Sequence, residues 1–311
     1  MAYSNGSPAS LTALMNDLKA FAIASGGFSD TGSGYTASSY TYFSLTKGSV
    51  KFNFSYKDAG GGGDVLANTS TAWAGSGLLT AQTGAHSANA RALFGLTPLE
   101  YWFFSDGVCV HAVVEISADC YAHLSFGVLE KAGSYTGGEY VCANYWASSD
   151  WTSSSNNRVF DFYVAGASYP NHIRLSYNAK TIALMGVYSD TSLNFAMNMW
   201  AGGGHALDGA SGLTDGELWK CQPNNYNGRS VLIPIEMFIA NVPGSFTSFN
   251  GWIPLGRVSN AAMINIKNLS AQDTVNTDWM VFPLCMKNPV TALTVASGQV
   301  NTYDLGLAYK K

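Results

Sequence analysis

The pattern of apolar and polar positions near the start of the chain predicts one amphipathic helix. Ser10 can cap its first turn with the side-chain oxygen, and Gly26-Gly27 supplies a stop. We therefore expect a helix over about residues 10–25, and its apolar stripe must cover a sheet or a partner molecule. The stripe has helical spacing and consists of Leu11, Leu14, Met15, Leu18, Phe21 and Ala22.

After this helix, the hydrophobic period changes to two. In residues 50–56, large apolar and polar side chains alternate strictly, as on a strand with one buried face. A hairpin turn is expected at residues 178–179. Further strands are predicted at 101–104, 108–116, 121–129, 158–164, 173–177, 182–188, 193–200, 231–239, 263–266, 279–286 and 305–309.

Strands do not alternate regularly with helices, which argues against a doubly wound α/β enzyme fold. We expect a mainly β protein, an antiparallel β-sandwich or barrel-like fold with one N-terminal amphipathic helix. A boundary near Pro98 would divide it. Residues 1–98 would form the helix plus a β segment, and residues 99–311 a β-rich domain with long Gly/Ser/Asn loops.

The amino-acid composition excludes several classes of protein. Charged residues make up 12 % of the 311 residues, about half the usual ~25 %. The chain has 8 Trp, 17 Tyr and 16 Phe, which excludes a disordered chain, and a net charge of −4, which argues against coating nucleic acid. No apolar run is long enough to span a bilayer, and the polar start does not resemble a signal peptide. The surface is therefore kept soluble by Ser, Thr, Asn and Gly, or it is covered by neighbouring subunits.

A search for catalytic chemistry finds no nucleophile elbow, zinc-protease or phosphate-loop motif. One cluster contains residue types that bind metals, but its spacing matches no standard zinc site. We interpret it as buried thiols and hydrogen-bonded histidines, with no metal or cofactor, and the sequence leaves open whether its members approach one another. The cluster consists of Cys109, His111, Cys120, His123 and Cys142.

Glycoside hydrolysis would require two carboxylates that flank a sugar. No spacing selects a pair, so we expect no enzyme and keep glycan degradation as a third hypothesis. The candidates are Glu115, Asp119, Glu130, Glu139, Asp150 and Asp161.

One aromatic loop is typical of sugar binding. Tyr145, Trp146 and Trp151 offer ring faces for C–H groups, and Asp150 offers a hydroxyl acceptor. The same residues would also suit a loop packed on its own sheet, or a subunit interface.

Several segments of the sequence are similar to those of a known protein family. The runs 101–107, 123–127 and 133–140, together with the helix, the strand at 279–283 and the tail at 305–310, resemble a family of virion structural proteins from tailed bacteriophages. The segment of about 150–260 contributes nothing to this resemblance.

The resemblance implies a non-enzymatic structural component of the particle (capsid, neck, tail or baseplate) that acts through multi-copy assembly. Expected partners are other virion structural proteins and further copies of the chain, without a membrane and without sequence-specific nucleic acid. The expected location is the virion, assembled in the host cytoplasm. The alternative is a host-receptor or glycan-binding protein at the tail tip.

The helix could dock on its own sheet or on a neighbour. We place the candidate assembly interface on Leu11, Leu14, Leu18, Phe21, Trp102 and Phe103.

Overall fold

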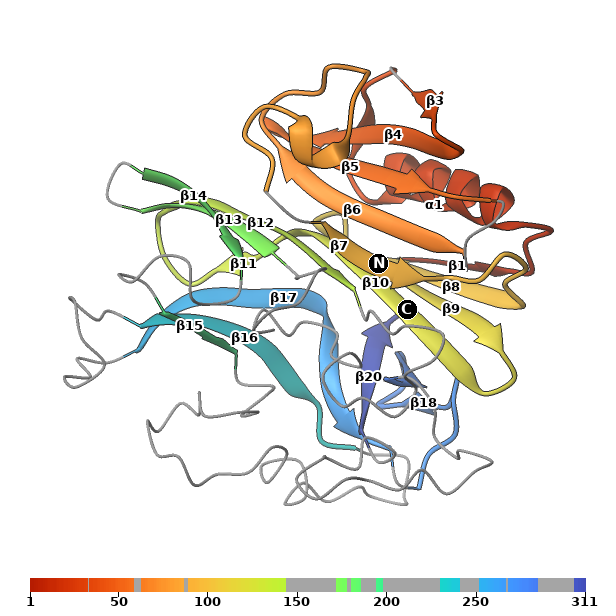
Figure 1. Cartoon of the computed structure of the whole chain (residues 1–311). Coiled ribbons are helices and arrows are strands. Elements are labelled where there is room, and N and C mark those ends of the chain that lie inside the picture. Colours follow the sequence, from red (N-terminus) through yellow and green to blue (C-terminus); the bar gives the residue numbers. More distant parts are fainter. Residues whose placement is uncertain are drawn as a thin grey trace, which may run out of the picture.

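Three antiparallel sheets are stacked in the computed structural model of the chain (Figure 1). The prediction of a mainly β, sandwich-like fold with one N-terminal helix is confirmed. The structure describes residues 1–32, 34–58, 63–86, 89–143, 172–177, 180–185, 194–197, 230–240, 252–266, 268–284 and 305–311. In this part of the chain, no helix combines the length and apolarity needed to cross a membrane.

The middle sheet provides the frame of the molecule. In spatial order it contains β1 (Ala2–Gly6), β8 (Glu100–Ser105), β9 (Cys109–Ser117), β10 (Cys120–Val128), β12 (Thr136–Ala143), β13 (His172–Tyr177) and β14 (Lys180–Met185). β13 and β14 pair as a hairpin from Tyr177↔Lys180 onward, and the predicted turn residues themselves lie outside the described residues.

The upper sheet is built from the N-terminal region. Its order is β2 (Ser29–Asp30), β4 (Tyr40–Lys47), β5 (Val50–Tyr56), β6 (Asp64–Ser70) and β7 (Ala90–Leu93), and β3 (Tyr35–Ala37) pairs with β4. A short 3₁₀ turn, η1 (Leu79–Ala81), lies between β6 and β7.

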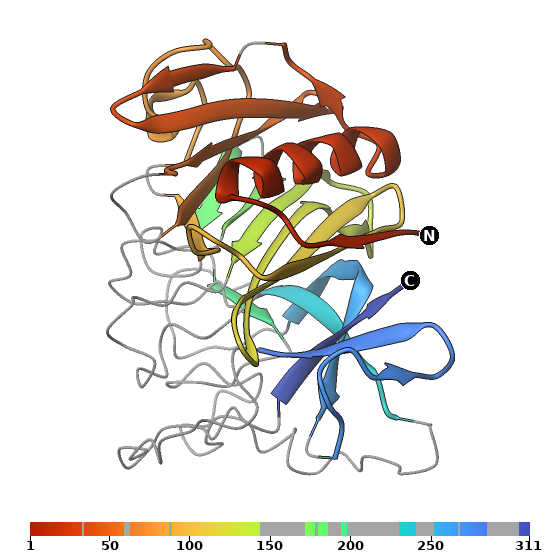
Figure 2. The ribbon, with the colours of Figure 1, turned by 90° about the vertical axis from the view of Figure 1, so that its right-hand side faces the viewer.

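The lower sheet is built from the C-terminal region. Its order is β15 (Asn194–Met197), β16 (Ile233–Ala240), β17 (Trp252–Asn265), β20 (Leu305–Lys310), β19 (Trp279–Pro283) and β18 (Thr274–Val275), and β11 (Glu130–Lys131) pairs with β17. β20 lies between two other strands, so the C-terminal segment is part of the sheet. The chain ends N and C lie close together in Figure 2.

The predicted helix is α1 (Leu11–Ser25). The Ser10 side chain accepts a hydrogen bond from the Ala13 amide at 3.2 Å, and Gly26 ends the helix, as the sequence indicates. The apolar stripe packs on the protein's own sheets: Phe21 contacts the ring of Phe103 on β8. Figure 2 shows the helix lying across the middle sheet beside the upper one.

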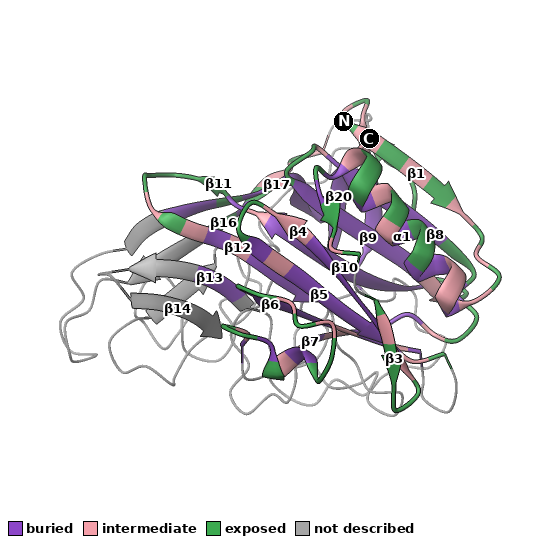
Figure 3. Ribbon diagram, turned by 90° about the horizontal axis from the view of Figure 1, so that it is seen from above, coloured by how far each residue is buried: buried purple, intermediate pink, exposed green. Residues whose placement is uncertain are grey.

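The strands β8, β9, β10 and β12 of the middle sheet are buried on both faces, because their alternate side chains enter two different cores. Phe103 on β8 points into the upper core, and its neighbours Trp102 and Phe104 point into the lower one. Seen from above, β8, β9 and β10 are mostly buried, whereas the edge strand β1 is largely exposed (Figure 3). A continuous apolar run such as 101–104 is therefore a strand covered on both sides.

The predicted boundary near residue 98 falls between β7 and β8, where the chain passes from the upper to the middle sheet. β1 nevertheless pairs with β8, and the upper core contains side chains from both regions.

The outer face of the upper sheet differs from expectation. The alternation in β5 predicts exposed polar side chains, but Asn53 and Ser55 are buried. Asn53 accepts a hydrogen bond from Ser44 and donates one to Ser70, both at 2.7 Å. Asn68 is also buried and donates to the backbone carbonyl of His86. The polar face is therefore a covered ladder of uncharged hydrogen bonds, which accounts for part of the low charge content.

Candidate functional site

A buried polar network joins the middle sheet to the lower sheet. His111 on β9 and Ser125 on β10 are directly paired across the two strands, and their side chains meet at 2.7 Å. The other imidazole nitrogen lies 2.9 Å from the backbone carbonyl of Ser259 on β17. Tyr140 on β12 extends the network, with its hydroxyl 3.2 Å from that of Ser125.

A second histidine makes a similar connection. The two ring nitrogens of His123 lie 2.9 Å from the Tyr309 hydroxyl and 2.8 Å from the Pro283 carbonyl oxygen. Burial lowers the pKa of both His111 and His123 to about 4, so both rings are neutral at pH 7. These histidines therefore act as hydrogen-bonding links between two sheets.

Cys109 and Asp106 connect the network to the surface. The Cys109 thiol lies 3.1 Å from the Ser259 hydroxyl, and burial raises the pKa of that thiol. Burial by itself raises the pKa of Asp106, but hydrogen bonds from Ser259 and from the amides of Cys109 and Val108 hold it below its usual value. Asp106 is thus a fixed carboxylate at the turn between β8 and β9.

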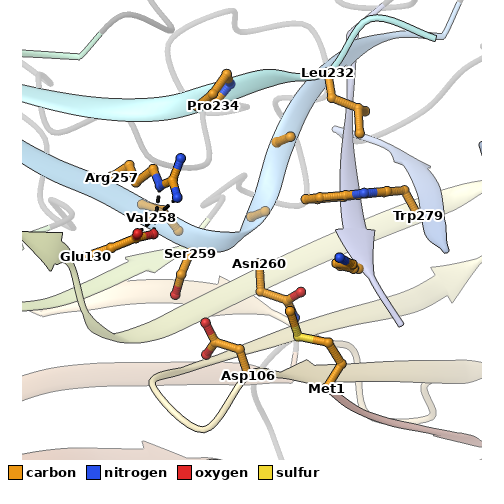
Figure 4. Close-up of a pocket in the computed structure, with 13 residues that line it drawn as sticks. Met1, Asp106, Glu130, Leu232, Pro234, Arg257, Val258, Ser259, Asn260 and Trp279 are labelled. Carbon is orange, nitrogen blue, oxygen red and sulfur yellow. Dashed lines mark hydrogen bonds and ion pairs between the residues drawn. The ribbon is translucent and has the colours of Figure 1, made fainter. Parts of the chain in front are cut away.

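A pocket of about 310 Å³ opens where Asp106 approaches β17 (Figure 4). This volume lies at the lower end of the ~300–1,000 Å³ typical of ligand pockets. Residues of β11, β16, β17, β19 and β20 contribute to it, together with the start of the chain. The lining consists of Met1, Asp106, Glu130, Leu232, Pro234, Arg257, Val258, Ser259, Asn260, Ala261, Ala262, Trp279 and Lys310.

The pocket is shaped by a bulge in β17. Pro234 pairs with Ala262 and the next residue, Ile235, pairs with Val258, so the intervening residues 259–261 have no counterpart on β16. Pro234 has no amide hydrogen to donate, which suits this interruption of the ladder. Asn260 has a φ of 58°, a left-handed conformation that asparagine tolerates better than most residues.

Asn260 is the most unusual side chain of the site. It is only 8 % exposed, yet neither its amide nitrogen nor its amide oxygen has a hydrogen-bond partner. Buried polar groups are nearly always paired, because an unpaired one has lost its hydration without compensation. The amide therefore offers one donor group and one acceptor group at the pocket wall.

Three of the four charged side chains that line the pocket are in ion pairs, and the fourth, Asp106, is held by hydrogen bonds. Arg257 donates two hydrogen bonds to the Glu130 carboxylate, at 2.7 and 2.9 Å. Lys310 pairs with Asp278 at 3.2 Å. Two acidic and two basic side chains thus line the pocket, which leaves its walls close to electrically neutral.

The structure assigns the predicted assembly residues to the protomer's own interior. Leu11, Leu14 and Leu18 lie in the upper core with Phe103, and Trp102 lies in the lower core. Phe21 is partly buried against the upper core. These side chains face the protein's own sheets, so a subunit interface has to use other residues.

The other predicted residues are placed as follows. Cys109, Cys120, Cys142, His111 and His123 are all buried, and in the described part of the chain no cluster suited to a metal ion occurs. The candidate sugar-binding residues Tyr145, Trp146, Asp150 and Trp151 lie outside the described residues, as do the carboxylates Asp150 and Asp161.

Sequence reasoning missed Asn260 and the pocket around it. An available signal was Pro234 inside a predicted strand, because proline within a sheet marks an edge or a bulge. Whether the Asn260 side-chain amide finds a hydrogen-bond partner depends on distant chain segments, so the sequence pattern could not predict that it lacks one.

Comparison of the sequence with protein-family models and with curated proteins found no match.

Proposed function

We propose that the protein is a non-enzymatic structural component of a tailed-phage virion that acts through multi-copy assembly with further copies of itself and with other virion proteins. The resemblance of its helix, its segments at 101–140 and its C-terminal strands to such proteins supports the virion role. The location that follows is the assembled particle.

The observation that carries the assembly role is the free edge of the middle sheet. Among the described strands, β1 pairs only with β8 and forms one end of the sheet order. An edge strand presents unpaired amide and carbonyl groups, which another chain can use to extend the sheet.

Exposed apolar side chains accompany this edge. Met1 is 67 % exposed and Tyr3 37 %, and Val108 in the adjacent β8–β9 turn is 38 % exposed. Ala2 is paired with Ser105, which places the start of β1 beside that turn. Strand pairing together with apolar contact is the combination expected of a subunit interface, and the occupant we propose is β1 of a second copy.

The buried network supports a non-enzymatic role. His111, His123, Cys109 and Tyr140 are residue types used in catalysis, but each is fully buried and bonded to another part of the protein. A general base must come within hydrogen-bond reach of its substrate, and these groups are enclosed between two sheets.

The test is the mass of the purified full-length chain in solution, measured by light scattering and native mass spectrometry. The wild type should form an oligomer of defined size. Tyr3→Lys places a charge on the edge strand and should shift the protein toward monomer. Leu78→Lys is the matched control, because Leu78 is exposed beside the 3₁₀ turn η1 on the upper sheet, and its oligomer should persist.

Mass spectrometry of purified phage particles tests the virion role separately. The chain should be present in the particles in many copies. A monomer at micromolar concentration contradicts the proposed assembly, and absence from particles contradicts the virion role.

A further inference from the structure

We propose that the pocket at the β17 bulge is a binding site for one neutral sugar unit, with the Asn260 amide as its hydrogen-bonding anchor and Trp279 as its apolar wall. This site shares Met1 with the proposed assembly edge, but its anchor Asn260 and its wall residue Trp279 lie on β17 and β19, away from the edge strand β1.

The Asn260 amide supplies the first argument. Both of its polar atoms are shielded from water and lack partners, although the side chain lines a pocket large enough for a small ligand. Figure 4 shows Asn260 above Asp106 and Met1, with its side chain pointing toward Met1. A ligand that offers a donor and an acceptor together would satisfy the amide, and hydroxyl and acetamido groups both do so.

Met1 lies beside Asn260 at this pocket (Figure 4). Its side chain lines the same pocket and is 67 % exposed, and exposed side chains change rotamer rapidly. Since Met1 belongs to neither core, a change of its rotamer can open space beside the amide without disturbing either core.

The charge balance selects a neutral ligand. Arg257 is committed to Glu130 and Lys310 to Asp278, while Asp106 accepts hydrogen bonds from two backbone amides. A phosphate or carboxylate would have to displace one of the acidic partners, and a cation would meet Arg257 or Lys310.

The remaining wall is apolar and selects a ligand with a C–H face. Leu232, Pro234 and Val258 line one part of the pocket, and the indole of Trp279 is partly exposed to it. Aromatic and aliphatic walls with a few placed polar groups are typical of ligand pockets. Among neutral ligands, a sugar ring combines C–H faces with hydroxyl groups that both donate and accept.

The experiment is titration of the full-length protein with methyl glycosides, followed by calorimetry and by ligand-observed NMR. The probes are methyl N-acetylglucosaminide, methyl glucoside and, as a charged comparison, methyl glucuronide. We expect binding in the micromolar to millimolar range by one or both neutral probes, and weaker binding of the glucuronide. Preference for the N-acetylated probe would assign the Asn260 amide to an acetamido group, and equal binding would assign it to a hydroxyl.

Two substitutions test the assigned residues. Asn260→Gly removes the amide and suits the left-handed backbone, so the fold should persist while affinity falls at least about tenfold. Trp279→Ala should weaken binding similarly. Asp119→Gly is the matched control, because Asp119 has a φ of 59° and is exposed in the β9–β10 turn, away from the pocket lining.

The proposal is overturned if neither neutral probe binds at 10 mM, well above the expected dissociation constants. It is also overturned if the Asn260→Gly and Trp279→Ala variants bind as tightly as the wild type, or if the glucuronide binds more tightly than both neutral probes.

Discussion

The imidazole of His123, on β10 of the middle sheet, lies 2.9 Å from the hydroxyl of Tyr309 on β20 of the lower sheet. The two residues are 186 positions apart and both are buried. Their contact ties the C-terminal strand to the middle of the molecule. The burial of His123, which lowers its pKa, makes the stability of the protein sensitive to pH.

Acid should destabilise the protein before its carboxylates titrate. Burial lowers the pKa of His111 and of His123 from 6.5 to about 4 in the folded state. Between these values the unfolded chain binds protons and the folded chain does not, so stability is complete above pH 6.5 and falls as the pH drops toward 4. At a pH below 4, the lowered pKa of each histidine reduces the free energy of unfolding by roughly 3 kcal/mol.

Guanidinium unfolding at pH 7, 6 and 5 measures this effect. The free energy of unfolding should decrease with falling pH, and the variant His123→Asn, which does not titrate there, should show a shallower decrease. Equal unfolding free energies at pH 7 and pH 5 would contradict the prediction.

Loss of the Tyr309 hydroxyl should leave a ring nitrogen of His123 without its partner. Tyr309→Phe keeps the ring packing, so the expected cost is that of an unpaired buried polar group, about 1–3 kcal/mol. Tyr3→Phe serves as the control, because Tyr3 is 37 % exposed and its hydroxyl can be hydrated. Chemical denaturation of the two variants gives the comparison, and similar stabilities would show that the His123–Tyr309 bond contributes little.

Close packing makes Gly306 on β20 intolerant of a side chain. A Cβ there would lie 2.6 Å from the Phe282 carbonyl oxygen and 2.5 Å from a methyl group of Ile266. Gly306→Ala should therefore cost about 1–3 kcal/mol through overpacking. Gly133→Ala is the matched control, since nothing lies within 4 Å of its added Cβ. Melting temperatures distinguish the two, and an unaffected Gly306→Ala protein would refute the close contact.

The helix stripe should behave as core. Leu14 is fully buried in the upper core, so Leu14→Ala should cost about 2–5 kcal/mol. Ile23→Ala, on the exposed side of the same helix at 39 % exposure, should change stability by under about 1 kcal/mol. Denaturation at two protein concentrations checks both values. If the Leu14→Ala variant kept its stability but lost its oligomeric state, the apolar stripe of α1 would be part of a subunit interface, as predicted from the sequence.

The sequence by itself determined the locally encoded elements. α1 is predicted from helical spacing and from the caps Ser10 and Gly26, each of which bonds within the turn at its own end of the helix. β5 occupies the predicted residues 50–56, because alternation is a property of consecutive residues. The antiparallel, mainly β class follows from many such strands without intervening helices.

Only the tertiary structure decided what covers each of these elements. Nothing local distinguishes Leu14 packed on its own sheet from Leu14 packed on a neighbour, and the structure shows the first. The buried Asn53 of β5 is bonded to Ser44 on β4 and to Ser70 on β6. The pocket at Asn260 gathers segments as distant as Met1 and Lys310. The physical reason is that periodicity records which face of an element is apolar, whereas burial and unmet hydrogen bonds depend on the distant segments that pack against that face.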